Sequence, residues 1–261
     1  MKLALASLDQ VWEDKSHNLR ACNKLILIAK SMGAELIVFP EMTLTGFSMN
    51  TSAIAESSAS SKSIKDFKKL AVDNDIAIIM GVVFQKDSKG SNNAVFIDNS
   101  GKVLASYQKL HPFSFSEENK YYLPGNDIFV ADFNSFKIGL TICYDLRFPE
   151  LYSALSKNCE LLVNIANWPK SRLEHWHILL KARAIENQVF VAGVNRIGKD
   201  PEGNTYEKSS VLVAPSGDIS NALFESADLD VYDVQLSVVE KSQSMFPTKQ
   251  DRRVDLYRRI L

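Results

Sequence analysis

The segment FKIGLTICYDLRFPE, residues 136–150, predicts a buried strand that ends at a cysteine. Its first part, Phe136–Ile142, is short and apolar, as a strand is. Proline is favoured at the first position of a helix, so Pro149 predicts a helix, which we expect to continue to Lys157. A second apolar strand is expected at residues 161–165. This strand, helix, strand order indicates an α/β fold.

The same alternation extends through the rest of the 261-residue chain. Residues 35–39 are apolar after the initial Glu35, which is typical of a strand buried on both faces. The turn residues at 99–101 predict a hairpin. We find no linker and no strong internal repeat, so we expect one domain of layered sheets covered by helices. Further strands are expected at 2–8, 76–84, 94–98, 102–107, 128–132, 189–194, 210–214 and 231–236, and helices at 19–32, 64–72, 173–185 and, as one closing turn, 238–242; order signals are weak at 52–63.

Composition excludes several classes of protein. Thirty basic and thirty-one acidic side chains give a net charge of -1, so no overall field attracts nucleic acid or anionic lipid. The apolar stretch at the amino terminus is too short for a signal peptide or a membrane span. The three cysteines, Cys22, Cys143 and Cys159, form no CxxC pair, which argues against a disulfide framework or a metal site. We expect a cytoplasmic protein with no cofactor.

The last residues, 247–261, form a basic tail. Asp251 and Asp255 lie between its lysine and arginines, which favours a solvated or partner-facing helix over a nucleic-acid site. The basic residues are Lys249, Arg252, Arg253, Arg258 and Arg259.

Three reactive side chains each follow a predicted strand: Glu41, Lys109 and Cys143. Ligands of α/β sheets gather where strands end in loops, so these side chains are expected to converge. Covalent amide hydrolysis needs a nucleophile, a base and a positive group for the oxyanion. An ordinary thiol, with a pKa of about 8.5, is mostly protonated at neutral pH and needs such partners. The set therefore predicts a cysteine hydrolase.

The segments around these residues, 39–42, 107–109 and 140–150, resemble the catalytic segments of the nitrilase superfamily of carbon-nitrogen hydrolases. The resemblance extends through 167–169, 175–176, 182–187 and 194–196 to the omega-amidase-like bacterial branch. It implies an α/β fold of one domain, residues 1–246, built as a four-layer αββα sandwich. It also implies a homodimer, with the tail 247–261 packing at the dimer interface.

The resemblance also implies roles for the site residues. Glu41 would be the general base, Lys109 would stabilise the oxyanion and Cys143 would be acylated. A second family glutamate, seven residues before the glycine of a Pro-Gly turn, corresponds to Glu118, although the adjacent Glu117 leaves that assignment open. The backbone N–H of Tyr144 would be a second oxyanion donor. Asp145 and Arg147 are expected to brace the turn after the nucleophile.

The branch implies a small amide substrate with a free carboxylate, such as 2-oxoglutaramate, and such a carboxylate calls for a cation. Arg172 is the candidate, although an exposed surface arginine is an equal alternative, and Trp168 and Asn167 are further candidate substrate contacts. Deaminated glutathione and N-carbamoyl amines are alternative substrates.

Two other functions remain open on the sequence. A papain-like thiol–imidazole pair could use one of the histidines, although their motif context favours structural roles. The chain could also be a catalytically silent binding protein, although every residue that the resemblance requires is retained. The histidines concerned are His111, His175 and His177.

Overall fold

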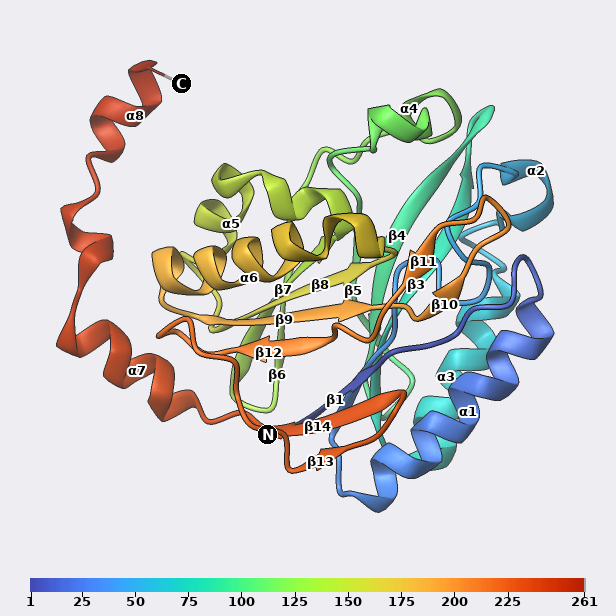
Figure 1. Cartoon of the computed structure of the whole chain (residues 1–261), viewed down its shortest axis with the longest axis horizontal. Helices are drawn as coiled ribbons and strands as arrows, with labels where there is room; N and C mark the ends of the chain where they lie inside the picture. Colours follow the sequence, from blue (N-terminus) through green and yellow to red (C-terminus); the bar gives the residue numbers. More distant parts are fainter. Residues whose placement is uncertain (261) are drawn as a thin grey trace.

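The computed structural model describes residues 1–260 and shows two β-sheets stacked between two layers of helices (Figure 1). The first sheet has seven strands in the order β13-β14-β1-β2-β3-β4-β5. Strands β1, β2 and β3 are parallel neighbours, and β3, β4 and β5 form antiparallel hairpins. Its strands are β1 (Lys2–Ala6), β2 (Leu36–Val38), β3 (Ala77–Lys86), β4 (Lys89–Ile97), β5 (Val103–Gln108), β13 (Phe224–Glu225) and β14 (Leu229–Asp233).

The second sheet has five strands in the order β12-β9-β8-β7-β6. Its centre, β7, β8 and β9, is parallel, and both edge strands are antiparallel to it. A separate two-stranded hairpin, β10 with β11, extends from the end of β9. The strands are β6 (Val130–Phe133), β7 (Phe136–Ile142), β8 (Leu161–Ala166), β9 (Phe190–Asn195), β10 (Gly198–Lys199), β11 (Thr205–Tyr206) and β12 (Val211–Val213).

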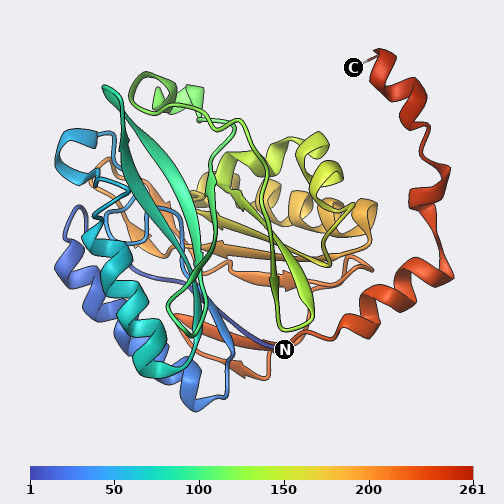
Figure 2. The same ribbon diagram turned by 180° about the vertical axis from the view of Figure 1, so that it is seen from behind.

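Helices α1 (Lys15–Ser31) and α3 (Lys62–Asn74) cover the outer face of the first sheet, and α5 (Pro149–Leu155) and α6 (Leu173–Asn187) cover that of the second (Figures 1 and 2). One apolar cluster lies between the sheets, and two others lie between a sheet and its helices. The predicted four-layer αββα fold is therefore confirmed. Shorter helical segments are α2 (Thr51–Ile54), α4 (Glu118–Tyr121) and the 3₁₀ turns η1 (Ser114–Ser116), η2 (Cys143–Arg147) and η3 (Lys170–Arg172).

Local sequence explains where the long helices begin and end. The side chains of Asp14 and Ser61 accept hydrogen bonds from backbone N–H groups in the first turns of α1 and α3. Asp75 ends α3 in the left-handed conformation. On α1 the apolar stripe that includes Cys22 faces the sheet and is completely buried.

The structure differs from the prediction in two places that matter for the site. Strand β4 begins at Lys89 rather than residue 94, because its polar first half, 89–93, pairs with β3 through a tight turn at Asp87. The hairpin from β10 to β11 was not predicted, since its strands have two residues each. Both segments contribute side chains to the site, Asn92 from the first half of β4 and Asp200 and Glu202 from the hairpin.

The chain ends in a segment that leaves the body of the molecule (Figure 1). It comprises α7 (Leu236–Met245), the 3₁₀ turn η4 (Thr248–Asp251) and α8 (Val254–Ile260). Lys249 Nζ donates to the Ser156 carbonyl at 2.7 Å and so ties the segment to α5, whereas α8 buries none of its residues. Within residues 1–260, no helix has the length and apolar character needed to cross a membrane.

Candidate active site

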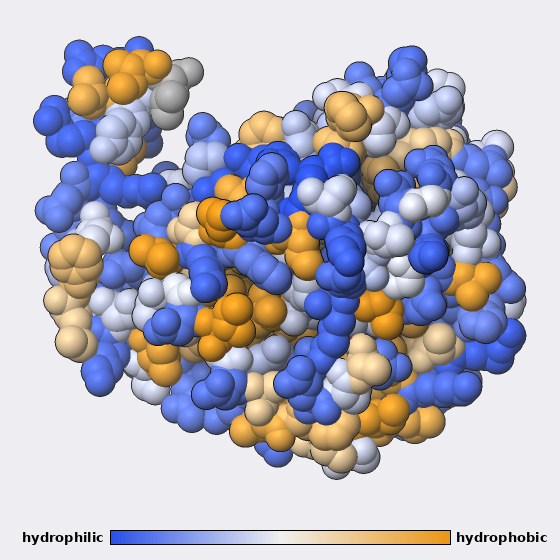
Figure 3. All heavy atoms as spheres, in the orientation of Figure 1, coloured by the Kyte–Doolittle hydropathy of each residue, from blue (hydrophilic) through white to orange (hydrophobic). Residues whose placement is uncertain are grey.

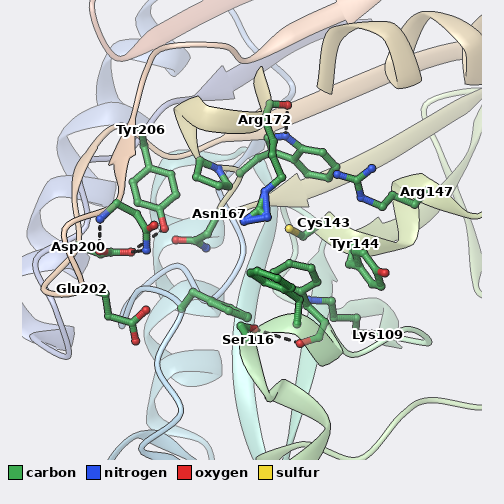
Figure 4. A pocket seen from close by; sticks show the side chains of 16 residues that line it. Lys109, Ser116, Cys143, Tyr144, Arg147, Asn167, Arg172, Asp200, Glu202 and Tyr206 are labelled. Carbon is green, nitrogen blue, oxygen red and sulfur yellow. Dashed lines mark hydrogen bonds between the residues drawn. The ribbon is translucent and has the colours of Figure 1, made fainter. Parts of the chain in front are cut away.

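The three predicted residues lie at one mouth of the two sheets. Glu41 follows β2, Lys109 follows β5, and Cys143 follows β7 as the first residue of η2. Lys109 and Cys143 line a cavity of about 260 Å³, together with Asn167, which follows β8 (Figure 4). Strands from both sheets therefore contribute to a single centre.

Lys109 is the centre of a buried charge cluster. Its Nζ lies 2.9 Å from Glu41 Oε1 and 2.9 Å from Glu118 Oε2, and all three side chains are at most 2% exposed. Asn92 Nδ2 donates to both carboxylates, at 2.7 Å to Glu41 Oε1 and 3.2 Å to Glu118 Oε1. Glu117 is exposed and pairs with Lys120 instead, so the structure brings Glu118 to the centre and not Glu117.

The charges in this cluster determine its protonation. Burial alone would lower the pKa of Lys109, but Glu118 and Glu41 raise it well above its usual value, so the ammonium stays charged. Burial raises the pKa of Cys143 well above its usual value, and Glu41 adds to this effect while Lys109 partly opposes it. The resting thiol is therefore protonated, and it needs a base at the moment of attack.

The backbone turns sharply at the nucleophile. Cys143 has a φ of 45°, in the left-handed region that a non-glycine residue adopts only under strong local constraint. Asp145 supplies that constraint: its Oδ2 accepts from the Ile142 backbone N–H at 3.0 Å and from the Tyr107 hydroxyl at 2.6 Å. The carboxylate of Asp145 thus braces the turn. Tyr144 is the second residue of η2, and the first N–H groups of a helical turn have no acceptor within that turn.

The main chain of Glu41 is held from two sides. Gln10 Nε2 donates to the Glu41 carbonyl at 3.0 Å, and Asn167 Nδ2 donates to it at 2.7 Å. The Asn167 backbone N–H donates to Glu41 Oε2 at 3.0 Å. A Cβ at Gly81 would come within 2.3 Å of the Met42 backbone nitrogen. Only glycine therefore lets β3 pack this closely against the main chain of Glu41 and Met42.

Two arginines form one wall of the cavity. Arg172 lies over the rings of Phe113 and Phe115, at 5.3 and 5.6 Å from their centroids. Arg147 lies 4.9 Å from the Trp168 ring and lines the cavity, and it also lies 6.0 Å from the ring of Tyr144 in the turn that it was expected to brace. Trp168 lines the same wall and donates through Nε1 to the Arg172 carbonyl at 2.7 Å.

The opposite wall is acidic and comes from the hairpin that the sequence did not reveal. Asp200 and Glu202 both line the cavity (Figure 4). Asp200 is occupied by hydrogen bonds from the Asn204 backbone N–H at 2.9 Å and the Tyr206 hydroxyl at 2.8 Å. The cavity therefore has cations on one side and carboxylates on the other.

The histidines do not form a thiol–imidazole pair. His111 Nδ1 lies 2.8 Å from Asp145 Oδ1, and its ring stacks on Phe148 at 3.7 Å. Among residues 1–260, no histidine lines the cavity beside Cys143. The papain-like alternative therefore has no geometric support.

The difference in burial among the cysteines makes a prediction about their reactivity. Cys143 is half-buried on the cavity wall, whereas Cys22 is 0% and Cys159 3% exposed. Iodoacetamide labelling followed by mass spectrometry should therefore modify Cys143 first, at a rate that still rises with pH beyond the range in which an ordinary thiol ionises, because burial raises the pKa of Cys143. Faster labelling of Cys22 or Cys159 would contradict the assignment of the nucleophile.

A family model described as carbon-nitrogen hydrolase matches residues 2–243. The chain belongs to the carbon-nitrogen hydrolase family. Among its relatives, omega-amidase YafV of Yersinia enterocolitica is 33% identical over 253 residues, which cover 96% of each protein. The 2-oxoglutaramate amidase of Bacillus subtilis (strain 168) is 31% identical over 231 residues, which cover 87% of this chain and 88% of that protein.

Solved structures of this hydrolase family have the same fold. An amidase from Nesterenkonia sp. has a TM-score of 0.86 and 27% identity, covering 100% of this chain and 96% of that one. XC1258 from Xanthomonas campestris, a CN-hydrolase superfamily protein, has a TM-score of 0.87 and 26% identity, covering 97% of each chain. The resemblance to the omega-amidase-like branch of the nitrilase superfamily is thus confirmed. The chain is a carbon-nitrogen hydrolase that acts on amides.

Proposed function

We propose that this hydrolase cleaves the terminal amide of a short dicarboxylic acid, such as 2-oxoglutaramate, through a thioester with Cys143. The observation that carries the proposal is the cavity itself, which joins Cys143 and Lys109 to two arginine side chains, Arg147 and Arg172. Relatives named omega-amidase and 2-oxoglutaramate amidase support the same substrate class.

The proposed reaction has two halves. Cys143 Sγ attacks the amide carbon while Glu41 accepts the thiol proton, and Lys109 and the Tyr144 N–H stabilise the oxyanion. Glu41 then protonates the amide nitrogen, and the carbon-nitrogen bond breaks. Ammonia departs, and the acyl group stays bound to Cys143 as a thioester. Water attacks the thioester, Glu41 accepts its proton and returns it to sulfur, and the carboxylic acid leaves. Glu118 holds the Lys109 ammonium throughout, at 2.9 Å.

The arginine wall gives the proposal its test. Arg172→Ala should lower kcat/KM for 2-oxoglutaramate about 10-fold or more, while turnover of uncharged butyramide should change little, because only the former leaves an anion unpaired. Arg147→Ala, measured on the same two substrates, shows whether the second arginine shares this role. Lys170→Ala is the matched control, since Lys170 is exposed, pairs with Glu207 and does not line the cavity.

Equal losses on both substrates in both arginine variants would exclude these residues as carboxylate ligands. Faster turnover of deaminated glutathione or of an N-carbamoyl amine than of 2-oxoglutaramate by the unmodified enzyme would replace the proposed substrate.

We further propose a cytoplasmic homodimer in which the tail 247–261 packs at the interface between two copies. Hydrophobic side chains reach the surface of the molecule (Figure 3). On α6, Ile178 and Ile185 are 56% and 54% exposed, and Phe246, just before the tail, is 71% exposed. A second copy would cover them. Sedimentation at micromolar concentration should give twice the 29.2 kDa chain mass, and a monomer would contradict the proposal.

A further inference from the structure

Asn92 carries a buried side-chain amide at the centre of the site. The proposed mechanism gives this residue no role. It lies in β4, is 1% exposed, and its Nδ2 donates to both Glu41 and Glu118. Its backbone carbonyl accepts the Lys109 backbone N–H at 2.9 Å. Asn92 therefore contacts both carboxylates through its side chain and the main chain of Lys109 through its own backbone.

These contacts divide the two oxygens of Glu41 into different environments. Oε1 accepts from Lys109 Nζ at 2.9 Å and from Asn92 Nδ2 at 2.7 Å. Oε2 accepts only from the backbone N–H of Asn167, at 3.0 Å, among the described residues. That same N–H lies beside the Cys143 thiol and favours its ionised form. Oε1 thus accepts two hydrogen bonds, while Oε2 accepts one, from an N–H that also lies beside Cys143, and keeps the capacity for a second.

We propose that Asn92 is a positioning residue that fixes Glu41 Oε1 and leaves Oε2 as the oxygen that carries the proton. This inference rests on the proposed role of Glu41 as general base. Two carboxylates that share one lysine repel each other, and a neutral donor to both favours their charged forms without adding charge. A hydrogen bond to an ionised group also fixes the plane of the carboxylate, which the proton transfer requires.

The neighbouring residue offers a matched control. Side chains alternate along a strand, so Asn93 points to the other face of β4, where its Nδ2 donates to Ser91 O and Oγ at 2.7 and 2.9 Å. Asn93 is also an asparagine and is also buried, at 5% exposed, but it does not contact the charge cluster. Substitutions at the two positions therefore impose a similar loss on the strand.

The test is the pH dependence of kcat/KM for amide hydrolysis in Asn92→Leu and Asn93→Leu. The groups that face Glu41 and could contribute to the profile are Lys109, Glu118, Cys143 and Tyr122. Loss of the Asn92 donor should lower kcat/KM about 10- to 100-fold and move the acid limb about one unit to higher pH, because the ionised carboxylates lose a donor. Asn93→Leu should leave the acid limb in place.

Asn92→Ser, whose hydroxyl is too short to span both carboxylates, gives the same expectation if the leucine variant does not fold. An unmoved acid limb in a folded Asn92 variant, or an equal shift in Asn93→Leu, would overturn the inference while the proposed function stands. Absence of amide turnover in the unmodified enzyme would instead overturn the proposed function, and this inference with it.

Discussion

Replacing Cys143 by alanine should abolish amide hydrolysis, with kcat lowered about 10⁴-fold or more, the scale on which covalent catalysis is lost when its nucleophile is removed. No other described thiol can substitute, because Cys22 and Cys159 are buried outside the cavity. Ammonia release under saturating substrate measures the loss. The fold should be retained, because a half-buried thiol is replaced by a smaller apolar side chain.

Cys159→Ala is the control for this variant. Cys159 is 3% exposed, burial raises the pKa of its thiol to about 12, and it lies in the apolar layer between the second sheet and its helices. Its loss should lower stability with little change in kcat. Turnover of Cys143→Ala close to that of the unmodified enzyme would favour a different nucleophile, or a binding protein with a contaminating activity.

The residues that the sequence predicted share one property. Glu41, Lys109 and Cys143 each follow a strand that is apolar enough to be recognised, and ligands of α/β sheets gather where strands end in loops. The layered fold follows from the same strands, since each sheet must bury a face against the other and a face against helices. Their convergence was therefore expected from the strand pattern, whereas the four-layer αββα arrangement and the role of each residue were implied by the resemblance to the nitrilase superfamily.

The site residues that the sequence analysis missed lie in segments without a clear hydrophobic pattern. Asn92 belongs to the polar run 89–93, which pairs as a strand only because β3 lies beside it. Glu202 lies on a hairpin whose strands are too short to give a period. Arg147 has a side chain long enough to leave the turn that it follows and stack on Trp168, which backbone position does not reveal. Each depends on tertiary contacts that local sequence does not encode.

Replacing Lys109 by methionine should affect catalysis and stability together. Loss of one oxyanion donor lowers turnover by about 100-fold or more. The same change leaves Glu41 and Glu118 buried without their shared cation, and breaking a buried ion pair in this way costs about 3–5 kcal/mol in the free energy of unfolding. Urea denaturation measures the second effect and steady-state kinetics the first.

A double variant separates these two effects. Glu118→Gln in the Lys109→Met background removes one of the two unpaired negative charges. In the unmodified protein the Phe113 backbone N–H donates to Glu118 Oε2 at 2.5 Å, and the oxygen of the glutamine amide can still accept this hydrogen bond. The double variant should therefore recover part of the lost stability but none of the lost turnover, because no cation returns to the oxyanion. Recovery of turnover along with stability would show that Lys109 acts only by holding the two glutamates together, and that the oxyanion relies on the backbone of η2 alone.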